Sequence, residues 1–294
     1  MEDKLIYFGE SITGRRSNNE DTFICEQIDD KTYLFIVADG MGGSEHGEVA
    51  SRIAVDSFLS HIKETFQRPF SLKQMKSVLK EGFEKAQIAI RNEIKLDRSH
   101  TGMGTTMVVL LFHNGCYAWG NIGDSRLYVI DPKGIRQITR DHTYIEDVLK
   151  KKNGNDISQS NLDQYSHIIT RSVSGGYDKS DLYPEGKDYL KLSGPKMFIL
   201  CSDGLITDKS NRKNEEEFYL NFQSDQNTEA FAKRLVKYAF ENGSNDNITA
   251  ICISFGQIPI VSESRKRKKS GSSDPGFTGN GTNVWRRILS LFKE

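Results

Sequence analysis

Residues 33–43, YLFIVADGMGG, decide the fold of this 294-residue chain. The apolar run Tyr33–Ala38 is typical of a β-strand that is buried on both faces. Asp39 follows it directly, and Gly40 then allows a close approach of other groups to the backbone. A carboxylate at the end of a buried strand is partly desolvated and needs a cation or several donors. The stretch therefore predicts a buried sheet with an acidic site at its edge.

Three further aspartates stand in short polar boxes at the borders of apolar runs: Asp124, Asp203 and Asp246. Arg126 is the only Lys or Arg inside any of the four boxes, so bound metal is expected to balance the charge. Oxygen ligands without clustered His or Cys favour Mg²⁺ or Mn²⁺. Any single Asp-Gly pair is as readily a plain turn. Four boxes together favour the metal site.

An acidic pair, Glu20-Asp21, closes the upstream loop GRRSNNED of residues 14–21. Glu20 adds a candidate ligand, and the forked guanidinium of Arg16 suits phosphate oxygens. The alternative for this loop is a solvated turn in which Arg16 pairs with Glu20.

Six motifs occur in a fixed order: RSNNED (16–21), VADGMGG (37–43), GTT (104–106), GDSR (123–126), SDGL (202–205) and NDNIT (245–249). In this order they resemble the PPM family of metal-dependent, type-2C serine/threonine protein phosphatases, and the Met after Asp-Gly is similar to its bacterial branch. The resemblance runs from about Gly14 to Phe255. It implies an α+β fold, a four-layer αββα sandwich of two antiparallel sheets flanked by helices, with a binuclear metal centre at one end.

Carried over to this sequence, the resemblance implies two core Mg²⁺ or Mn²⁺ ions. Asp39 would bridge both ions. Asp203 and Asp246 would complete one site, and Glu20 with the Gly40 carbonyl would complete the other.

The resemblance further implies a weaker third ion, held by Asp124 with Asp203, and binding of the substrate phosphate by Arg16. Catalytic roles therefore fall to Arg16, Asp39 and Asp203. Many eukaryotic relatives place a His where this chain has Met41, so the identity of any general acid stays open.

The expected activity is hydrolysis of phosphoserine and phosphothreonine in proteins by a metal-activated water, opposing a serine/threonine kinase. The alternative is a pseudophosphatase, a signalling module that binds phosphoprotein without turnover. A cysteine-nucleophile phosphatase is excluded, because no Arg stands six residues after any of the four cysteines. An aspartate-nucleophile enzyme is excluded as well, because Cys201 stands where the nucleophile preceding Asp203 would be.

Strands are expected to come in hairpins, and helices to show apolar residues at a spacing of three and four. The predicted strands are 5–10, 22–26, 33–38, 105–112, 116–120, 126–130, 135–138, 197–201 and 248–255, and the predicted helices are 47–66, 71–96 and 228–241. Residues 141–189 are polar and are expected to be irregular. In the family the corresponding part is a flap beside the active site, so this segment is a candidate for substrate selection.

The composition changes after residue 256. Residues 1–256 are predicted to be the catalytic domain, 257–283 a basic, Gly/Ser-rich flexible linker, and 284–294 a short amphipathic helix. Residues 257–294 hold eight basic and three acidic side chains, although the chain has no net charge, and residues 265–294 are expected to contact a membrane or a protein. The acidic body argues against nucleic-acid binding. A cytoplasmic monomer, at most peripheral on a membrane, is expected from the absence of a secretory signal and the scattered cysteines.

Overall fold

The computed structural model describes residues 5–41, 46–131, 134–151, 165, 168–176, 189–206 and 227–256, and for 148–151 the backbone alone. The predicted linker and terminal helix, 257–294, lie outside the described residues. So does most of the expected flap. The domain boundaries therefore stay predictions.

Two antiparallel sheets form the centre of the molecule. The first has the order β1-β12-β11-β7-β8. Its strands are β1 (Ile6–Ile12), β7 (Arg126–Asp131), β8 (Gly134–Gln137), β11 (Lys196–Cys201) and β12 (Ile248–Phe255). The expected hairpin across residues 131–134 is confirmed, since β7 pairs antiparallel with β8.

The second sheet is built around β3 (Thr32–Met41), whose residues from Thr32 to Ala38 are all buried. Its order is β10-β6-β5-β3-β4-β9, with β2 paired to β3. The other strands are β2 (Asp21–Asp29), β4 (Gly104–Thr105), β5 (Met107–His113), β6 (Cys116–Ile122), β9 (Val173–Ser174) and β10 (Leu190–Lys191). Asn114 and Gly115 make the predicted turn between β5 and β6 with φ values of +50° and +72°.

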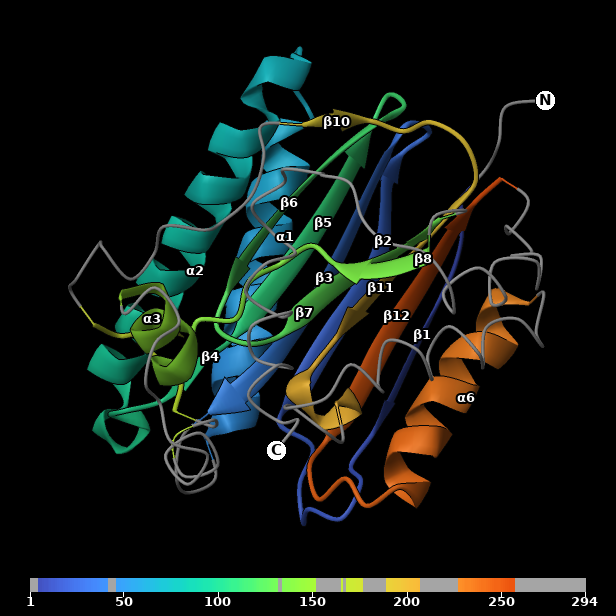
Figure 1. Ribbon diagram of the computed structural model, residues 1–294. Coiled ribbons are helices and arrows are strands. Elements are labelled where there is room, and N and C mark those ends of the chain that lie inside the picture. The colour runs from blue at the N-terminus through green and yellow to red at the C-terminus, as the bar shows by residue number, and fades with distance from the viewer. Residues whose placement is uncertain are drawn as a thin grey trace.

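The sheets stack face to face, and helices cover both outer faces (Figure 1). One apolar cluster fills the space between the sheets and includes Phe35 and Phe198. A second lies between the β3 sheet and the helices α1 (Gly47–Thr65) and α2 (Met75–Leu96), and a third lies under α6 (Thr228–Glu241). The predicted four-layer αββα sandwich is confirmed.

The prediction that 141–189 is irregular is wrong for Tyr144–Lys151, which form the helix α3. Two acidic residues, Glu146 and Asp147, occupy its first turn, where they interact favourably with the helix dipole. Arg140 pairs with both of them, at 3.8 and 3.0 Å. Ile145, Val148 and Leu149 have the spacing of one helix face, so the segment is amphipathic as well as supported by local ion pairs.

The start of the second helix also differs, because a 3₁₀ turn, Leu72–Gln74, precedes α2. Within the described part of the chain, no helix is both long and apolar enough to cross a membrane. The four cysteines are free thiols, and three of them are buried.

Candidate metal centre

The strand ends of the two sheets bring the acidic residues to one edge of the sandwich. Asp21 begins β2 and lies opposite Asp39, near the end of β3, in the antiparallel ladder. Asp203 follows the end of β11, and Asp246 precedes the start of the neighbouring β12. Because antiparallel neighbours place the end of one strand beside the start of the next, each pair shares an edge.

Asp21 joins the two sheets at this edge. Its Oδ2 accepts hydrogen bonds from Ser202 Oγ at 2.7 Å and from Thr249 Oγ1 at 2.6 Å, both in the other sheet. Its Oδ1 is sealed from solvent and has no hydrogen-bond partner among the described residues. Burial, opposed by those two hydrogen bonds, raises the pKa of Asp21 to about 7, with further contributions from Asp203 and Asp246. A buried carboxylate oxygen without a partner indicates a missing cation or donor.

Asp39 stands at the centre of this acidic cluster. Burial raises the pKa of its carboxyl well above the ordinary value, and the negative charges of Asp21, Asp203, Asp124 and Asp246 raise it further. The negative charges of all four neighbouring aspartates therefore act on the carboxyl of Asp39.

The Gly-Thr-Thr motif holds the backbone of Asp39. The Asp39 carbonyl accepts from Thr105 Oγ1 and from the Thr106 amide, both at 2.8 Å. The Asp39 amide donates to Thr106 Oγ1 at 3.2 Å. Thr106 Oγ1 also shares a 2.7 Å hydrogen bond with Ser125 Oγ, so the loop that carries Asp124 is tied to the strand that carries Asp39.

Glu20 lies against the N-terminus of α1. A Cβ at Gly47, the first residue of this helix, would lie 2.7 Å from Glu20 Cδ. Burial and the nearby Glu48 raise the pKa of Glu20, while Arg16 and the Gly47 amide lower it. Gly40 packs against the backbone of both residues: a Cβ at this position would lie 2.8 Å from the Glu20 carbonyl oxygen and 2.1 Å from the Gly47 carbonyl oxygen. Only glycine fits at Gly40, and it brings the end of β3 beside Glu20.

Asp203 and Asp246 are brought together by a second close approach of two backbones. A Cβ at Gly204 would lie 1.9 Å from the Asn247 carbonyl oxygen. Ser244 Oγ donates to the Gly204 carbonyl at 2.7 Å. The turn after β11 therefore packs directly on the segment before β12.

Arg16 binds Asp246, and the alternative pairing with Glu20 in a solvated loop is wrong. Arg16 Nη2 lies 2.8 Å from Asp246 Oδ2, and its Nε donates to the Asn245 carbonyl at 3.0 Å. The Arg16 side chain is 55% exposed. It therefore stands at the rim of the acidic cluster, within reach of an incoming anion.

The donor set fits Mg²⁺ or Mn²⁺, because it consists of carboxylates and a backbone carbonyl. The unpartnered Asp21 Oδ1 and the mutual repulsion recorded at Asp39 both indicate that a cation belongs here. Among the described residues, no group of three or more Asp, Glu, His or Cys side chains lies close enough together to hold a metal ion as it stands. Asp246 is paired with the guanidinium of Arg16.

Two residues that matter at this edge were missed as site residues in the sequence. The motifs mark Asp21 only as the neighbour of Glu20, although it directly precedes the predicted strand 22–26. Asn247 Nδ2 donates to the carbonyls of Thr13 and Asn18 at 2.9 and 2.8 Å, and its Oδ1 accepts from the Glu20 amide at 2.9 Å. This side chain fixes the Arg16 loop to β12, and only its place beside Asp246 could have signalled it.

Comparisons with known proteins agree with this geometry. A family model described as protein phosphatase 2C matches residues 8–247. The chain is 28% identical over 236 residues to the serine/threonine protein phosphatase PstP of Mycobacterium tuberculosis, covering 80% of this chain and 42% of PstP. It is 28% identical over 243 residues to the serine/threonine phosphatase stp of Listeria welshimeri, covering 81% and 90%. The chain thus spans less than half the length of the first of these relatives.

Solved structures show the same similarity. The PstP catalytic domain in complex with two manganese ions is 26% identical, with a TM-score of 0.69 over 85% of this chain and 98% of that one. Stp1 from Staphylococcus aureus, at 24% identity, has a TM-score of 0.73 over 87% and 96%, which supports the fold alone.

Proposed function

This chain belongs to the protein phosphatase 2C family, and we propose that it hydrolyses phosphoserine and phosphothreonine in proteins with the help of Mg²⁺ or Mn²⁺. The observation that carries the proposal is the buried carboxyl of Asp39, whose pKa is raised by burial and by the negative charges of the four nearby aspartates. Negative charge clustered at one edge destabilises the fold, and bound cations would relieve this repulsion.

We assign the ligands as the motif order implies. Asp39 would be shared by two core ions, with Asp203 and Asp246 on one and Glu20 with the Gly40 carbonyl on the other. Asp124 and Asp203 would hold a third, weaker ion. Bound Mg²⁺ or Mn²⁺ would activate the attacking water and neutralise the phosphoryl oxygens.

The chain's own residues bind and orient the substrate. Arg16 is half exposed, and its forked guanidinium matches two phosphate oxygens. Arg16, which pairs with Asp246 at 2.8 Å, would hold the substrate phosphate beside the ion at Asp246. Asn247 and the Gly-Thr-Thr motif fix the backbones of Glu20 and Asp39.

The test is hydrolysis of a phosphothreonine peptide by the full chain with Mn²⁺, with and without excess EDTA. We expect turnover that EDTA abolishes and added Mn²⁺ restores, and no turnover by Asp39→Asn under the same conditions. Full activity in EDTA would contradict the metal-dependent mechanism. A parent protein that binds the phosphopeptide but never hydrolyses it would instead support the pseudophosphatase alternative, which no observation on the described residues favours.

We infer phosphoprotein substrates of a serine/threonine kinase, and an enzyme that acts as a monomer in the cytoplasm. The basic residues and apolar end of 265–294, which lie outside the described residues, would attach it to the inner face of a membrane or to a partner protein. Sedimentation with anionic and neutral vesicles, before and after removal of 257–294, separates membrane binding from protein binding.

A further inference from the structure

The loop that carries Asp124, Gly123–Ser125, is held on one side by Thr106. Thr106 and Ser125 share a hydrogen bond of 2.7 Å, and a Cβ at Gly123 would lie 2.6 Å from Thr106 Cβ. Gly123 also has a φ of +97°, a conformation that favours glycine. Because Thr106 bonds the Asp39 amide as well, this contact sets the loop relative to Asp39.

His142 holds the same loop on its other side. The Gly123 amide donates to His142 Nδ1 at 3.1 Å, and the His142 amide donates back to the Gly123 carbonyl at 3.0 Å. His142 is fully buried. It belongs to the segment 141–147 that follows β8, so part of the support for Asp124 comes from outside the strands that carry the other aspartates.

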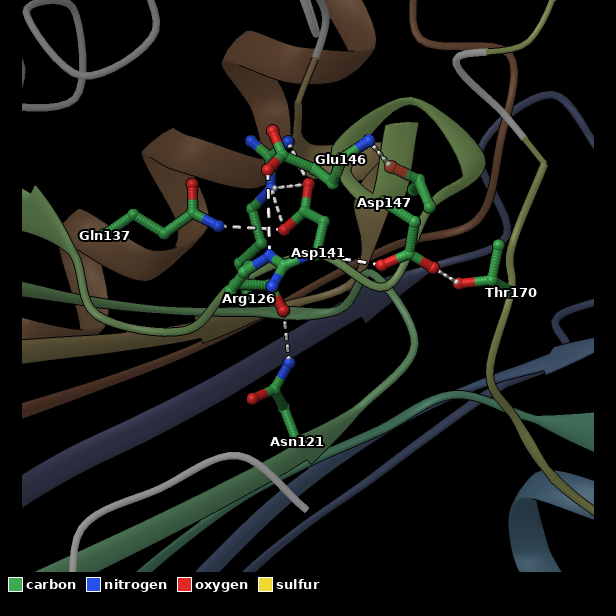
Figure 2. Close-up of polar contacts among 9 residues, drawn as sticks. Asn121, Arg126, Gln137, Asp141, Glu146, Asp147 and Thr170 are labelled. Carbon is green, nitrogen blue, oxygen red and sulfur yellow. Dashed lines mark hydrogen bonds and ion pairs between the residues drawn. The ribbon is translucent and has the colours of Figure 1, made fainter. Parts of the chain in front are cut away.

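A buried ion pair fixes the position of this segment. In Figure 2, dashed lines join Asp141, the residue before His142, to both Arg126 and Gln137. Arg126 Nε lies 3.1 and 3.0 Å from the two carboxylate oxygens of Asp141, and its Nη2 lies 2.6 Å from Oδ2. Gln137 Nε2 donates to Oδ1 at 2.8 Å, and both charged side chains are 13% exposed. Desolvation offsets much of the attraction in such a pair, so stability alone explains it poorly.

Further hydrogen bonds hold Asp147 and Thr170 near His142. Asp147 accepts from Arg140 Nη2 at 3.0 Å and from Thr170 Oγ1 at 2.8 Å, as Figure 2 shows for Thr170. The Thr170 amide donates to the His142 carbonyl at 2.8 Å. Asn121 Nδ2, near the end of β6, donates to the Arg140 carbonyl at 2.8 Å. Arg140, Asp147 and Thr170 are therefore joined around His142.

We propose that Arg126 and Asp141 are positioning residues for Asp124: their ion pair locks His142 against Gly123 and thereby fixes where the Asp124 carboxylate stands. The consequence for metal binding rests on the proposed function. Residues 140–147 would then be coupled to the ion held by Asp124, so that a disturbance of the Arg126–Asp141 pair changes the metal affinity at Asp124 and leaves the ions at Asp39 in place.

The test uses the full chain and the variants Arg126→Lys and Asp141→Asn. Arg126→Lys keeps the charge but loses the fork, whereas Asp141→Asn leaves a buried cation without its partner and is the variant more prone to unfold. The matched control is Arg136→Lys, which alters an Arg–Asp pair of 2.8 Å with Asp131 at the other end of β7. Hydrogen exchange of the metal-free protein is measured over residues 121–127 and 141–147. Mn²⁺ binding is then followed calorimetrically, with Asp124→Ala identifying the step that belongs to Asp124.

We expect Arg126→Lys to exchange its amide hydrogens faster than the parent in residues 121–127 and 141–147. We expect Arg136→Lys to exchange at the parent's rate in both stretches. The Asp124-dependent Mn²⁺ step should weaken by about 10- to 100-fold, as is usual when a group that orients a ligand is lost, while the tighter steps stay within about twofold. Exchange and Mn²⁺ isotherms of Arg126→Lys that match the control would overturn the proposal, as would equal loss at every step. If the parent neither binds Mn²⁺ nor hydrolyses phosphopeptide, the proposed function has failed, and the exchange data alone decide whether the pair positions the Asp124 loop.

Discussion

Replacing Asp21 by Asn should make the metal-free protein more stable at neutral pH. The pKa of Asp21 lies at about 7 in the folded chain, against an ordinary value of 3.8. An acid whose pKa is raised on folding contributes stability that is complete below the unfolded pKa and lost as the pH rises through the folded pKa. The window of loss for Asp21 therefore runs from about pH 4 to about pH 7.

The size of the effect follows from the shift. Roughly three pKa units, at ~1.36 kcal/mol per unit, correspond to up to about 4 kcal/mol of unfolding free energy lost at pH 7.5. The Asn side chain keeps an oxygen that can accept from Ser202 and Thr249 but carries no charge. Asp21→Asn should therefore recover most of this free energy at pH 7.5 but only about 1 kcal/mol at pH 4.5, where the folded carboxyl is protonated and most of the unfolded carboxyl is already ionised.

The assay is urea unfolding in EDTA, followed by circular dichroism between pH 4.5 and 8. The control is Asp56→Asn, which removes the same formal charge from an exposed position on α1. Saturating Mn²⁺ should restore the stability of the parent at pH 7.5, because a ligand that binds only the folded state stabilises it. Unfolding free energies of parent and Asp21→Asn that run parallel across the whole pH range would refute the reasoning.

Much of the fold was readable from the sequence because its strands and turns are locally specified. The run before Asp39 is buried along its whole length, and Asn114-Gly115 supplies the two positive φ values that its hairpin needs. Helix α3 was missed although Ile145, Val148 and Leu149 have helical spacing, because it is only eight residues long and follows a polar stretch. A periodic pattern in so short a window is a weak signal of helix.

The candidate site was predictable as a set of residues but not as an arrangement. Motif order named Asp39, Asp203 and Asp246 without saying which strands pair. The contact of Arg16 with Asp246 joins residues 230 positions apart, so no local pattern could favour it over the nearby Glu20. Asp21 was overlooked for the same reason, because its two hydrogen-bond donors belong to the other sheet.

Four further outcomes are expected. Asp39→Asn should lose tight Mn²⁺ binding and at least about a hundredfold in kcat/KM, since the shared ligand and its charge go together; two tight ions in calorimetry would contradict this. Asp124→Ala should keep both tight Mn²⁺ steps and lower kcat more than it raises KM in steady-state kinetics. Gly204→Ala should lower the unfolding free energy by about 1–3 kcal/mol or more in urea titrations, because its Cβ would lie 1.9 Å from the backbone oxygen of the residue that precedes β12. Arg16→Ala should raise KM by about tenfold or more with little change in kcat, because it removes a charge-assisted contact to the bound phosphate. The same change frees Asp246 from a guanidinium held at 2.8 Å, so calorimetric Mn²⁺ affinity should not fall; an unchanged KM together with weaker Mn²⁺ binding would mean that Arg16 supports the metal site and does not bind the substrate.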